Sequence, residues 1–348
     1  MLSKVIKFIK KDAVLTIAWV LAIISAFIVH PSAEYLDYID FRSLGILWSL
    51  MMIMQIFKEN GLFSLVGQKL VSQTKKVWQL VVVLVMLCFF FSMLITNDVA
   101  LITFVPLAIM ILRGCGLTKL MIPVIVLQTI AANLGSMMTP MGNPQNLYLY
   151  GLSGLGFGEF AAIVGPYTAI VFVFLLIFCM LINAAKDDVE MAESEESKIE
   201  NKLTIEVFGI LFLIAICVVL RLVDYKTLVI AVLAVTFFVS RNSLLKVDYA
   251  LLLTFIGFFI FTGNMGRIEA VKTALNSLVA GRELIAGVVC SQVISNVPAA
   301  LLLSGFSSNL KELILGVNFG GLGTLIASMA SLISFKLYSA EADANKGT

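Results

Sequence analysis

Two short polar motifs interrupt apolar runs in the two halves of the sequence. Thr96 and Asn97 form the first motif, and Ser295 and Asn296 form the second. Each motif places a hydroxyl beside a primary amide, and the amide offers two donors and an acceptor oxygen. No histidine or acid cluster adjoins either motif, so the residues indicate binding rather than bond cleavage.

If the chain turns back at each motif, the second arm begins with free backbone N–H groups and the positive end of a helix dipole. Both favour an anion, whereas the last carbonyls of the first arm suit a cation. One tip can therefore hold a cation and an anion side by side, with Asn97 and Asn296 as ligands. The alternative is that these hydroxyl and amide side chains only cap their helices.

A second pair of signals follows the two motifs. An asparagine, a glycine and a threonine recur at one spacing, as Asn133, Gly135 and Thr139 and again as Asn318, Gly320 and Thr324. Polar segments that break the backbone inside hydrocarbon are tolerated only where they line a site. Matched pairs of such segments are the best sequence pointer to a transporter's binding site.

The segment 139–146 cannot be a continuous α-helix, because two prolines flank a glycine within it. The break frees carbonyls and presents Asn143 and Asn146, whereas the second-half break is made by glycines and presents Thr324. Oxygens of these kinds suit a hard monovalent cation such as sodium, and the three side chains are candidate substrate ligands. The alternative is a kink that serves packing alone.

Asp98 is the one carboxylate that we place deep in an apolar stretch, and an intramembrane acid is a functional candidate by default. Burial favours the neutral acid, so Asp98 could carry a proton, or it could bind sodium in its charged form. The alternative is an N-cap for a helix that starts at Val99. No Lys or Arg falls in the predicted core, so an anionic substrate would depend on dipoles, amides and a bound cation.

The composition indicates a membrane protein. Hydrophobic residues make up 60% of the chain and charged residues 13%, against about a quarter charged in soluble domains. The net charge of +2 and the scattered basic residues indicate no nucleic-acid partner. The five cysteines have no metal-binding spacing, so we expect core-filling thiols and no cofactor other than a coupling ion, Na⁺ or H⁺.

The apolar segments predict an all-α polytopic membrane protein. We expect spans near 13–30, 43–57, 120–150, 160–183, 204–222, 226–241, 248–264 and 311–338, with hairpins at 78–112 and 284–306. The spans 120–150 and 311–338 are the broken ones. The arms of the second hairpin are too short to cross a bilayer, which favours a re-entrant hairpin, whereas the first hairpin could be re-entrant or fully spanning.

The chain organisation predicts two inverted repeats, each with a re-entrant helical hairpin and a broken transmembrane helix. They cover 1–183 and 204–338, joined by a charged cytoplasmic linker at 184–203 and followed by a tail at 339–348. Equivalent elements are five spans apart, and an odd offset inserts the second repeat upside down. Placing both termini in the cytoplasm puts most Lys and Arg inside, which indicates a multi-pass protein of the cell (plasma or inner) membrane.

At these motifs the chain resembles the ion transporter superfamily, which includes divalent anion/sodium symporters, citrate transporters, arsenite permeases and one class of sodium/proton antiporters. Ser295-Asn296-Val297 is similar to the symporters' Ser-Asn-Thr motif, with valine in place of threonine. Thr96-Asn97-Asp98 is closer to the arsenite permeases. The stretch 132–146 is similar to the broken-helix signature, and the likeness covers about 13 to 338. We expect neither the family's helix before the first repeat nor its last helix.

The resemblance implies two hairpins that point at each other, an elevator-type motion and a homodimer. It also implies two half-sites for cation and substrate, made by Thr96, Asn97, Asn133 and Gly135 and by Ser295, Asn296, Asn318 and Gly320. We expect a secondary transporter of a small anion, such as a di- or tricarboxylate, coupled to sodium or protons. Arsenite or antimonite efflux and sodium/proton exchange are alternatives within the same fold.

Two other classes fit the sequence poorly. A channel needs polar faces along several helices, whereas polarity here is confined to the four breaks. An intramembrane enzyme needs a nucleophile with its base, or metal ligands, and the sequence offers neither. We therefore expect a transporter and no catalytic residue.

Overall fold

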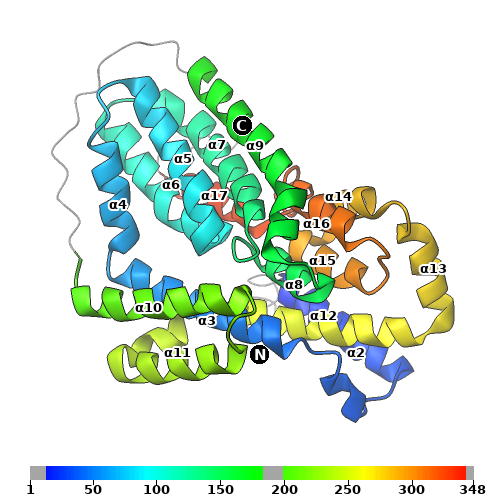
Figure 1. The fold of residues 1–348 in the computed structure, drawn as a ribbon. Coiled ribbons are helices and arrows are strands. Elements are labelled where there is room, and N and C mark those ends of the chain that lie inside the picture. Colours follow the sequence, from blue (N-terminus) through cyan, green and yellow to red (C-terminus); the bar gives the residue numbers. More distant parts are fainter. Residues whose placement is uncertain (1–12, 183–198, 342–348) are drawn as a thin grey trace, which may run out of the picture.

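The computed structural model describes residues 13–182 and 199–341, which form helices joined by short connections and contain no strand (Figure 1). The predicted all-α architecture is confirmed for these residues. Most of the predicted linker 184–203 and tail 339–348 lies outside the described residues.

The first half contains two hairpin arms and one broken helix. In chain order its helices are α2 (Ala13–Ile28), η1 (Ala33–Leu36), α3 (Phe41–Glu59), α4 (Leu62–Val71), α5 (Val77–Ile95), α6 (Asn97–Gly114), η2 (Thr118–Leu120), α7 (Met121–Gly135), η3 (Ser136–Met138), α8 (Pro144–Ser153) and α9 (Phe157–Ile182). The arms α5 and α6 meet at Thr96. The predicted broken span 120–150 is α7, η3 and α8.

The second half repeats this order. Its helices are α10 (Lys202–Val219), α11 (Tyr225–Val239), η4 (Arg241–Lys246), α12 (Tyr249–Arg267), α13 (Glu269–Val279), α14 (Glu283–Ile294), α15 (Asn296–Ser304), α16 (Leu310–Phe319) and α17 (Met329–Ser339). The arms α14 and α15 meet at Ser295, and the predicted broken span 311–338 is α16 and α17. The opposite orientation of the two halves in a membrane stays a prediction.

Several helices are long and apolar enough to cross a bilayer. Within the described residues there are six: Val77–Ile95, Asn97–Gly114, Thr118–Met138, Phe157–Leu181, Lys202–Val219 and Tyr249–Arg267. A seventh candidate is the pair α13 and α14, which is bent by 107°. The predicted spans at 13–30 and 226–241 form shorter apolar helices, α2 and α11. The predicted span at 43–57 forms α3, which contains charged residues at both ends.

The two hairpins differ in length. The arms α5 and α6 have 19 and 18 residues, and each could cross a bilayer. The arms α14 and α15 have only 12 and 9 residues, which is too short to cross a bilayer and agrees with the predicted re-entrant hairpin. For residues 78–112 the structure therefore favours arms of full spanning length.

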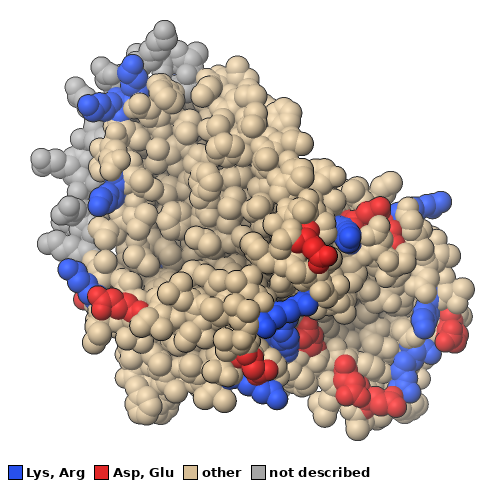
Figure 2. All heavy atoms as spheres, viewed as in Figure 1, with Lys and Arg blue, Asp and Glu red and all other residues tan. Residues whose placement is uncertain are grey.

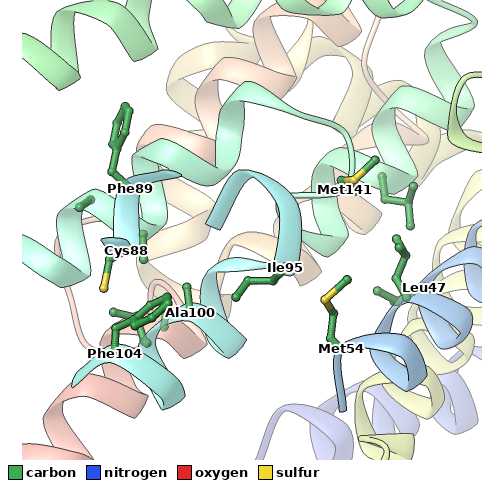
Figure 3. Close-up of a cluster of buried hydrophobic side chains, with 14 of the residues drawn as sticks. Leu47, Met54, Cys88, Phe89, Ile95, Ala100, Phe104 and Met141 are labelled. Atoms are coloured by element: carbon green, nitrogen blue, oxygen red, sulfur yellow. The ribbon is translucent and has the colours of Figure 1, made fainter. Parts of the chain in front are cut away.

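A buried apolar cluster holds the first hairpin against its neighbours (Figure 3). Phe91 of α5 and Phe104 of α6 bring these arms together, with ring centroids 5.1 Å apart, and Met54 of α3 and Met141 of the first break lie beside Ile95. Helix α5 packs along α7, α2 along α12 and α14 along α16. This packing fixes the first break and the first tip against α3.

The outer surface matches a lipid environment. On the face shown in Figure 2, charged side chains gather at the periphery and in the lower part of the view, and a broad area is free of them. Helix α9 exposes large apolar side chains, including Phe174, Phe178 and Leu181. In water such an exposed apolar face would favour aggregation, whereas in a bilayer it contacts the acyl chains of the lipids.

Candidate functional site

Both hairpin tips have the same unusual backbone conformation. Thr96 has φ 72° and ψ 149°, and Ser295 has φ 76° and ψ 155°. This region is populated almost only by glycine and costs about 1–3 kcal/mol for another residue. Neither hydroxyl caps the following helix, so the alternative of a capping role is wrong for these two hydroxyls.

The amides beside the two hydroxyls do serve the backbone. Asn97 Oδ1 accepts from the Asp98 N–H at 3.0 Å, and Asn296 Oδ1 accepts from the Val297 N–H at 2.9 Å. An amide oxygen has two lone pairs, so Asn97 Oδ1 keeps capacity for a ligand, and at Asn296 Oδ1 a ligand can replace the long contact from Ser295 Oγ at 3.5 Å. A partial capping role and a binding role are therefore compatible at both positions.

The broken spans supply carbonyls to the tips. The Asn97 N–H donates to Gly142 O at 3.0 Å, and the Asn296 N–H donates to Ala327 O at 2.9 Å. In the first turn of α15 every N–H has a protein acceptor, and Pro298 has none to offer. The backbone donors expected for an anion at the second tip are thus occupied in this conformation.

The recurring Asn-Gly-Thr spacing joins each broken span to its hairpin. Thr139 Oγ1 donates to Met93 O, and Thr324 Oγ1 donates to Gln292 O at 3.0 Å. A Cβ on Gly135 would lie 2.5 Å from Phe89 O. A Cβ on Gly320 would lie 2.6 Å from the Ser291 side chain. Both glycines are needed because the helices touch there.

Four buried asparagines connect the two broken spans. Asn143 Nδ2 donates to Asn318 Oδ1 at 3.0 Å, and Asn318 Nδ2 donates to Asn146 Oδ1 at 2.6 Å. Asn133 Oδ1 accepts from Ser328 Oγ at 2.8 Å and from Asn97 Nδ2 at 3.4 Å. Asn143, Asn146 and Asn318 bond to one another and Asn133 bonds to Ser328, so this amide network joins the two broken spans.

The same contacts occur at equivalent positions of the two halves. Asn143 caps α8 and reaches Asn318, whereas Ser328 caps α17 and reaches Asn133. The N–H groups of Asn97 and Asn296 form a second such pair, because each donates to a break carbonyl of its own half, Gly142 O and Ala327 O. Local architecture is therefore shared by the halves.

A small cavity of about 40 Å³ lies where the tips meet. It is lined by Asn97 and Asp98 of the first tip, Ser295, Asn296, Val297 and Pro298 of the second, Pro144, Gln145, Ser328 and Met329 of the broken spans, and Val14, Asp248, Leu251 and Thr254. About 10–15 Å³ of such space holds one water. The central cavity can hold an ion with a few waters, and it must widen to admit a dicarboxylate.

A larger space of about 410 Å³, the vestibule, adjoins the central cavity. Both are lined by Asp98 and Asp248, and Lys58 and Lys246 line the vestibule alone. Segments that contain these lysines are cytoplasmic in the predicted topology, so the vestibule opens inward if that topology holds.

An ion pair between the halves lies beside the vestibule, which Lys246 lines. Lys246 Nζ lies 2.7 Å from Glu59 Oε1, and Glu59 also accepts from Ser243 and Gln55. Glu59 lies beyond the predicted span 43–57. Its burial alone would raise the pKa of its carboxyl, but the hydrogen bonds and the lysine outweigh burial and lower that pKa.

The structure separates the predicted site residues into two groups. Asn97, Asp98, Ser295 and Asn296 line the central cavity, and Thr96 lines the vestibule. The others line neither space: Asn133, Gly135, Asn143, Asn146, Asn318, Gly320 and Thr324. This second group holds the broken spans in place.

Asp98 does not cap a helix as one alternative supposed. Helix α6 begins at Asn97 rather than Val99, and Asp98 Oδ1 is buried without a hydrogen-bond partner among the described residues. Asp248, which sequence reasoning missed, faces the same cavity from the start of α12. In the sequence Asp248 stands at the end of a predicted span, where an N-cap aspartate is ordinary. Only the structure, which places it at the same cavity as Asp98, makes it a candidate site residue.

Comparison with known proteins identifies the family. The model of the citrate transporter family matches residues 2–334. An uncharacterized transporter of Methanocaldococcus jannaschii is 32% identical over 317 residues, which are 89% of this chain and 84% of the relative.

Two further relatives fit this match. The inner membrane protein YbiR of Escherichia coli is 29% identical over 323 residues, covering 90% of this chain and 84% of the relative. A putative transporter arsB of Dictyostelium discoideum is 26% identical over 133 residues, covering 38% and 23%. With a family match over nearly its whole length and several helices able to cross a bilayer, the chain is a multi-pass membrane transporter of the citrate transporter family.

Proposed function

We propose that the protein is a secondary active transporter of a small anion, such as a di- or tricarboxylate, coupled to sodium or protons. One observation carries the proposal: both hairpin tips and the acid Asp98 line a single cavity. The match to the citrate transporter family supports a carboxylate as the substrate class.

The two tips together bind the cation and, through it, the anion. Oxygens of Asn97, Ser295 and Asn296 suit a hard cation, and that cation attracts the anion's carboxylates. Lys58, in the vestibule, adds positive charge along the approach to the tips. Asn133, Asn143, Asn146, Asn318 and Thr324 then act as positioning residues, because their side chains are engaged with protein groups.

Alternating access needs the cavity to open on two sides in turn. The vestibule provides one route, and a contact between Tyr148 OH and Ser304 Oγ at 2.9 Å joins α8 to α15. This contact must break if those helices separate during transport. The family resemblance favours an elevator-type motion in a dimer, and two repeats with shared local contacts are suited to exchanging conformations.

The proposal is tested with purified protein in proteoliposomes. Uptake of radiolabelled citrate, succinate and malate is measured under an imposed sodium gradient, an imposed pH gradient, both, or neither. We expect one of these anions to accumulate with at least one cation gradient. Equal uptake with and without both gradients for every anion would contradict coupled transport.

Arsenite or antimonite extrusion is the second candidate. The residues lining the central cavity include no Lys or Arg, and the backbone donors of the second tip are occupied. Both features suit a small solute of low charge, and one relative is named a putative transporter arsB. Arsenite flux in the same proteoliposomes distinguishes the candidates, as does cation exchange with no anion present for the antiporter alternative.

A further inference from the structure

Asp98 has an oxygen that nothing in the described protein satisfies. Its Oδ1 atom is buried and has no hydrogen-bond partner, and the side chain lines both the central cavity and the vestibule. Burying a carboxylate oxygen without a hydrogen bond is unfavourable in free energy, so such an atom in a native structure requires an explanation, for example a bound ligand. A bound cation at the cavity would supply the missing partner.

Asp248 brings a second carboxylate to the same space from the other half of the chain. It lines both cavities, it is exposed to the vestibule, and it interacts electrostatically with Asp98. Two like charges facing each other repel, and a cation between them reverses this effect.

Among the described residues, no basic group forms an ion pair with Asp98 or Asp248. Lys246 is engaged with Glu59, which leaves Lys58 of α3 as the other basic group lining the vestibule. The broken spans contribute Pro144 and Met329, which carry no charge.

We infer that Asp248 and Asp98 together bind one hard monovalent cation of the sodium type between the two halves. Asn97, Ser295 and Asn296 line the same small cavity and supply neutral oxygens. The inference rests on the proposed function and assigns a residue, Asp248, to its coupling ion. A magnesium ion demands a near-ideal octahedral shell and dehydrates reluctantly, so it fits this set of side-chain oxygens less well.

The site couples the two solutes by charge. Without the cation, two carboxylates repel an incoming anion. With the cation, the net charge of the pair falls from −2 to −1, and the cation itself attracts the anion. Sodium therefore binds before the anion, and each increases the affinity for the other.

Asp40 provides a matched control for Asp248. Asp248 caps α12 through the Leu251 N–H, with φ −75° and ψ 81°. Asp40 caps α3 through the Ser43 N–H, with φ −78° and ψ 83°, and lines neither cavity. Asparagine is as good an N-cap as aspartate, so Asp→Asn removes charge at both positions and keeps both caps.

The experiment is a melting-temperature titration of purified protein with NaCl, against KCl, choline chloride and MgCl₂ at matched ionic strength. A ligand of the folded state raises the melting temperature by mass action. We expect a sodium-specific rise in the wild type and in Asp40→Asn. In Asp248→Asn and Asp98→Asn the sodium concentration for half the rise increases about tenfold or more.

Asp248→Ser, which also keeps a cap, replaces Asp248→Asn if the latter does not fold. A sodium response of Asp248→Asn equal to the wild type would overturn the inference, as would equal responses of the wild type to all salts or a response to MgCl₂ alone. Failure of the proposed function is recognised separately, in the proteoliposome assay, because anion uptake would then be the same with and without every cation gradient. If a cation gradient drives uptake but Asp248→Asn responds to sodium as the wild type does, the inference about Asp248 is wrong and the proposed function stands.

Discussion

At the residue scale, the strained tips are the feature that the structure adds to the sequence. Polar motifs at Thr96 and Ser295 could be predicted, because they interrupt apolar runs. Their positive φ angles could not, because neither residue type favours that region. Asp248 also escaped prediction, since its partner Asp98 is distant in sequence and only packing brings them to one cavity.

Ser295→Gly and Ser295→Ala test the strain at the second tip. Glycine adopts this backbone freely and alanine does not, so we expect Ser295→Gly to be more stable than Ser295→Ala by about 1 kcal/mol. Thermal unfolding of both variants in the same detergent measures the difference. Equal stability would show that the tip carries no strain.

Asp98→Asn tests whether the first tip carries protons. If the acid couples transport to protons, the variant should lose most of the pH dependence of anion uptake, because an amide cannot take up and release a proton as a carboxyl group does. Asp224→Asn, which caps α11 through the Lys226 N–H, is the control and should keep the wild-type pH profile. An unchanged profile in Asp98→Asn would leave sodium as the coupling ion.

At the element scale, the breaks could be predicted and their contacts could not. Prolines and glycines within the apolar spans 120–150 and 311–338 indicate interrupted helices, and α7–α8 and α16–α17 are interrupted there. The contacts Thr139 to Met93 and Thr324 to Gln292 depend on how each broken span lies against its hairpin. No local sequence pattern encodes that arrangement.

The two break glycines should respond differently to alanine. At Gly320 the new Cβ meets the Ser291 side chain, so Gly320→Ala should be destabilised by about 1–3 kcal/mol and partly rescued by Ser291→Gly. At Gly135 the new Cβ meets the backbone oxygen of Phe89, and Ser92→Gly should give little rescue. Melting temperatures of the single and double variants check both statements. Equal rescue at both glycines would contradict these two packing contacts.

The amide network should behave as one unit. Asn318→Ala leaves the Nδ2 of Asn143 and the Oδ1 of Asn146 without this partner, so we expect a loss of about 1–3 kcal/mol. Asn143→Ala combined with Asn318→Ala should cost less than the sum of the two single changes. A denaturant or thermal double-mutant cycle measures the coupling, and strict additivity would count against the bridge.

At the scale of the whole molecule, composition and span count predicted an all-helical, multi-span protein, and the structure and family match confirm this. The charge distribution predicted which loops are cytoplasmic, and that orientation stays a prediction. That both tips line one cavity could not be predicted from the sequence. The tips are far apart along the chain, and their contacts with the broken spans bring them together.

The ion pair between Glu59 and Lys246 links the halves, and its effect depends on pH. Because the pKa of Glu59 is lowered, its contribution is present above the ordinary Glu value and is lost as the pH falls through the folded-state pKa. We expect the wild type to lose more stability than Glu59→Gln on acidification, by no more than about 1 kcal/mol. Melting temperature against pH measures this, and parallel curves would show that the pair contributes nothing.

The central claim is that both tips bind the transported solutes in one cavity. The most direct test is gradient-driven anion uptake by Asn97→Ala and Asn296→Ala in proteoliposomes, with Asn201→Ala, a cap of α10, as the control. We predict that each tip variant folds and loses cation-dependent uptake, while the control keeps it. Wild-type uptake by both tip variants would contradict the claim.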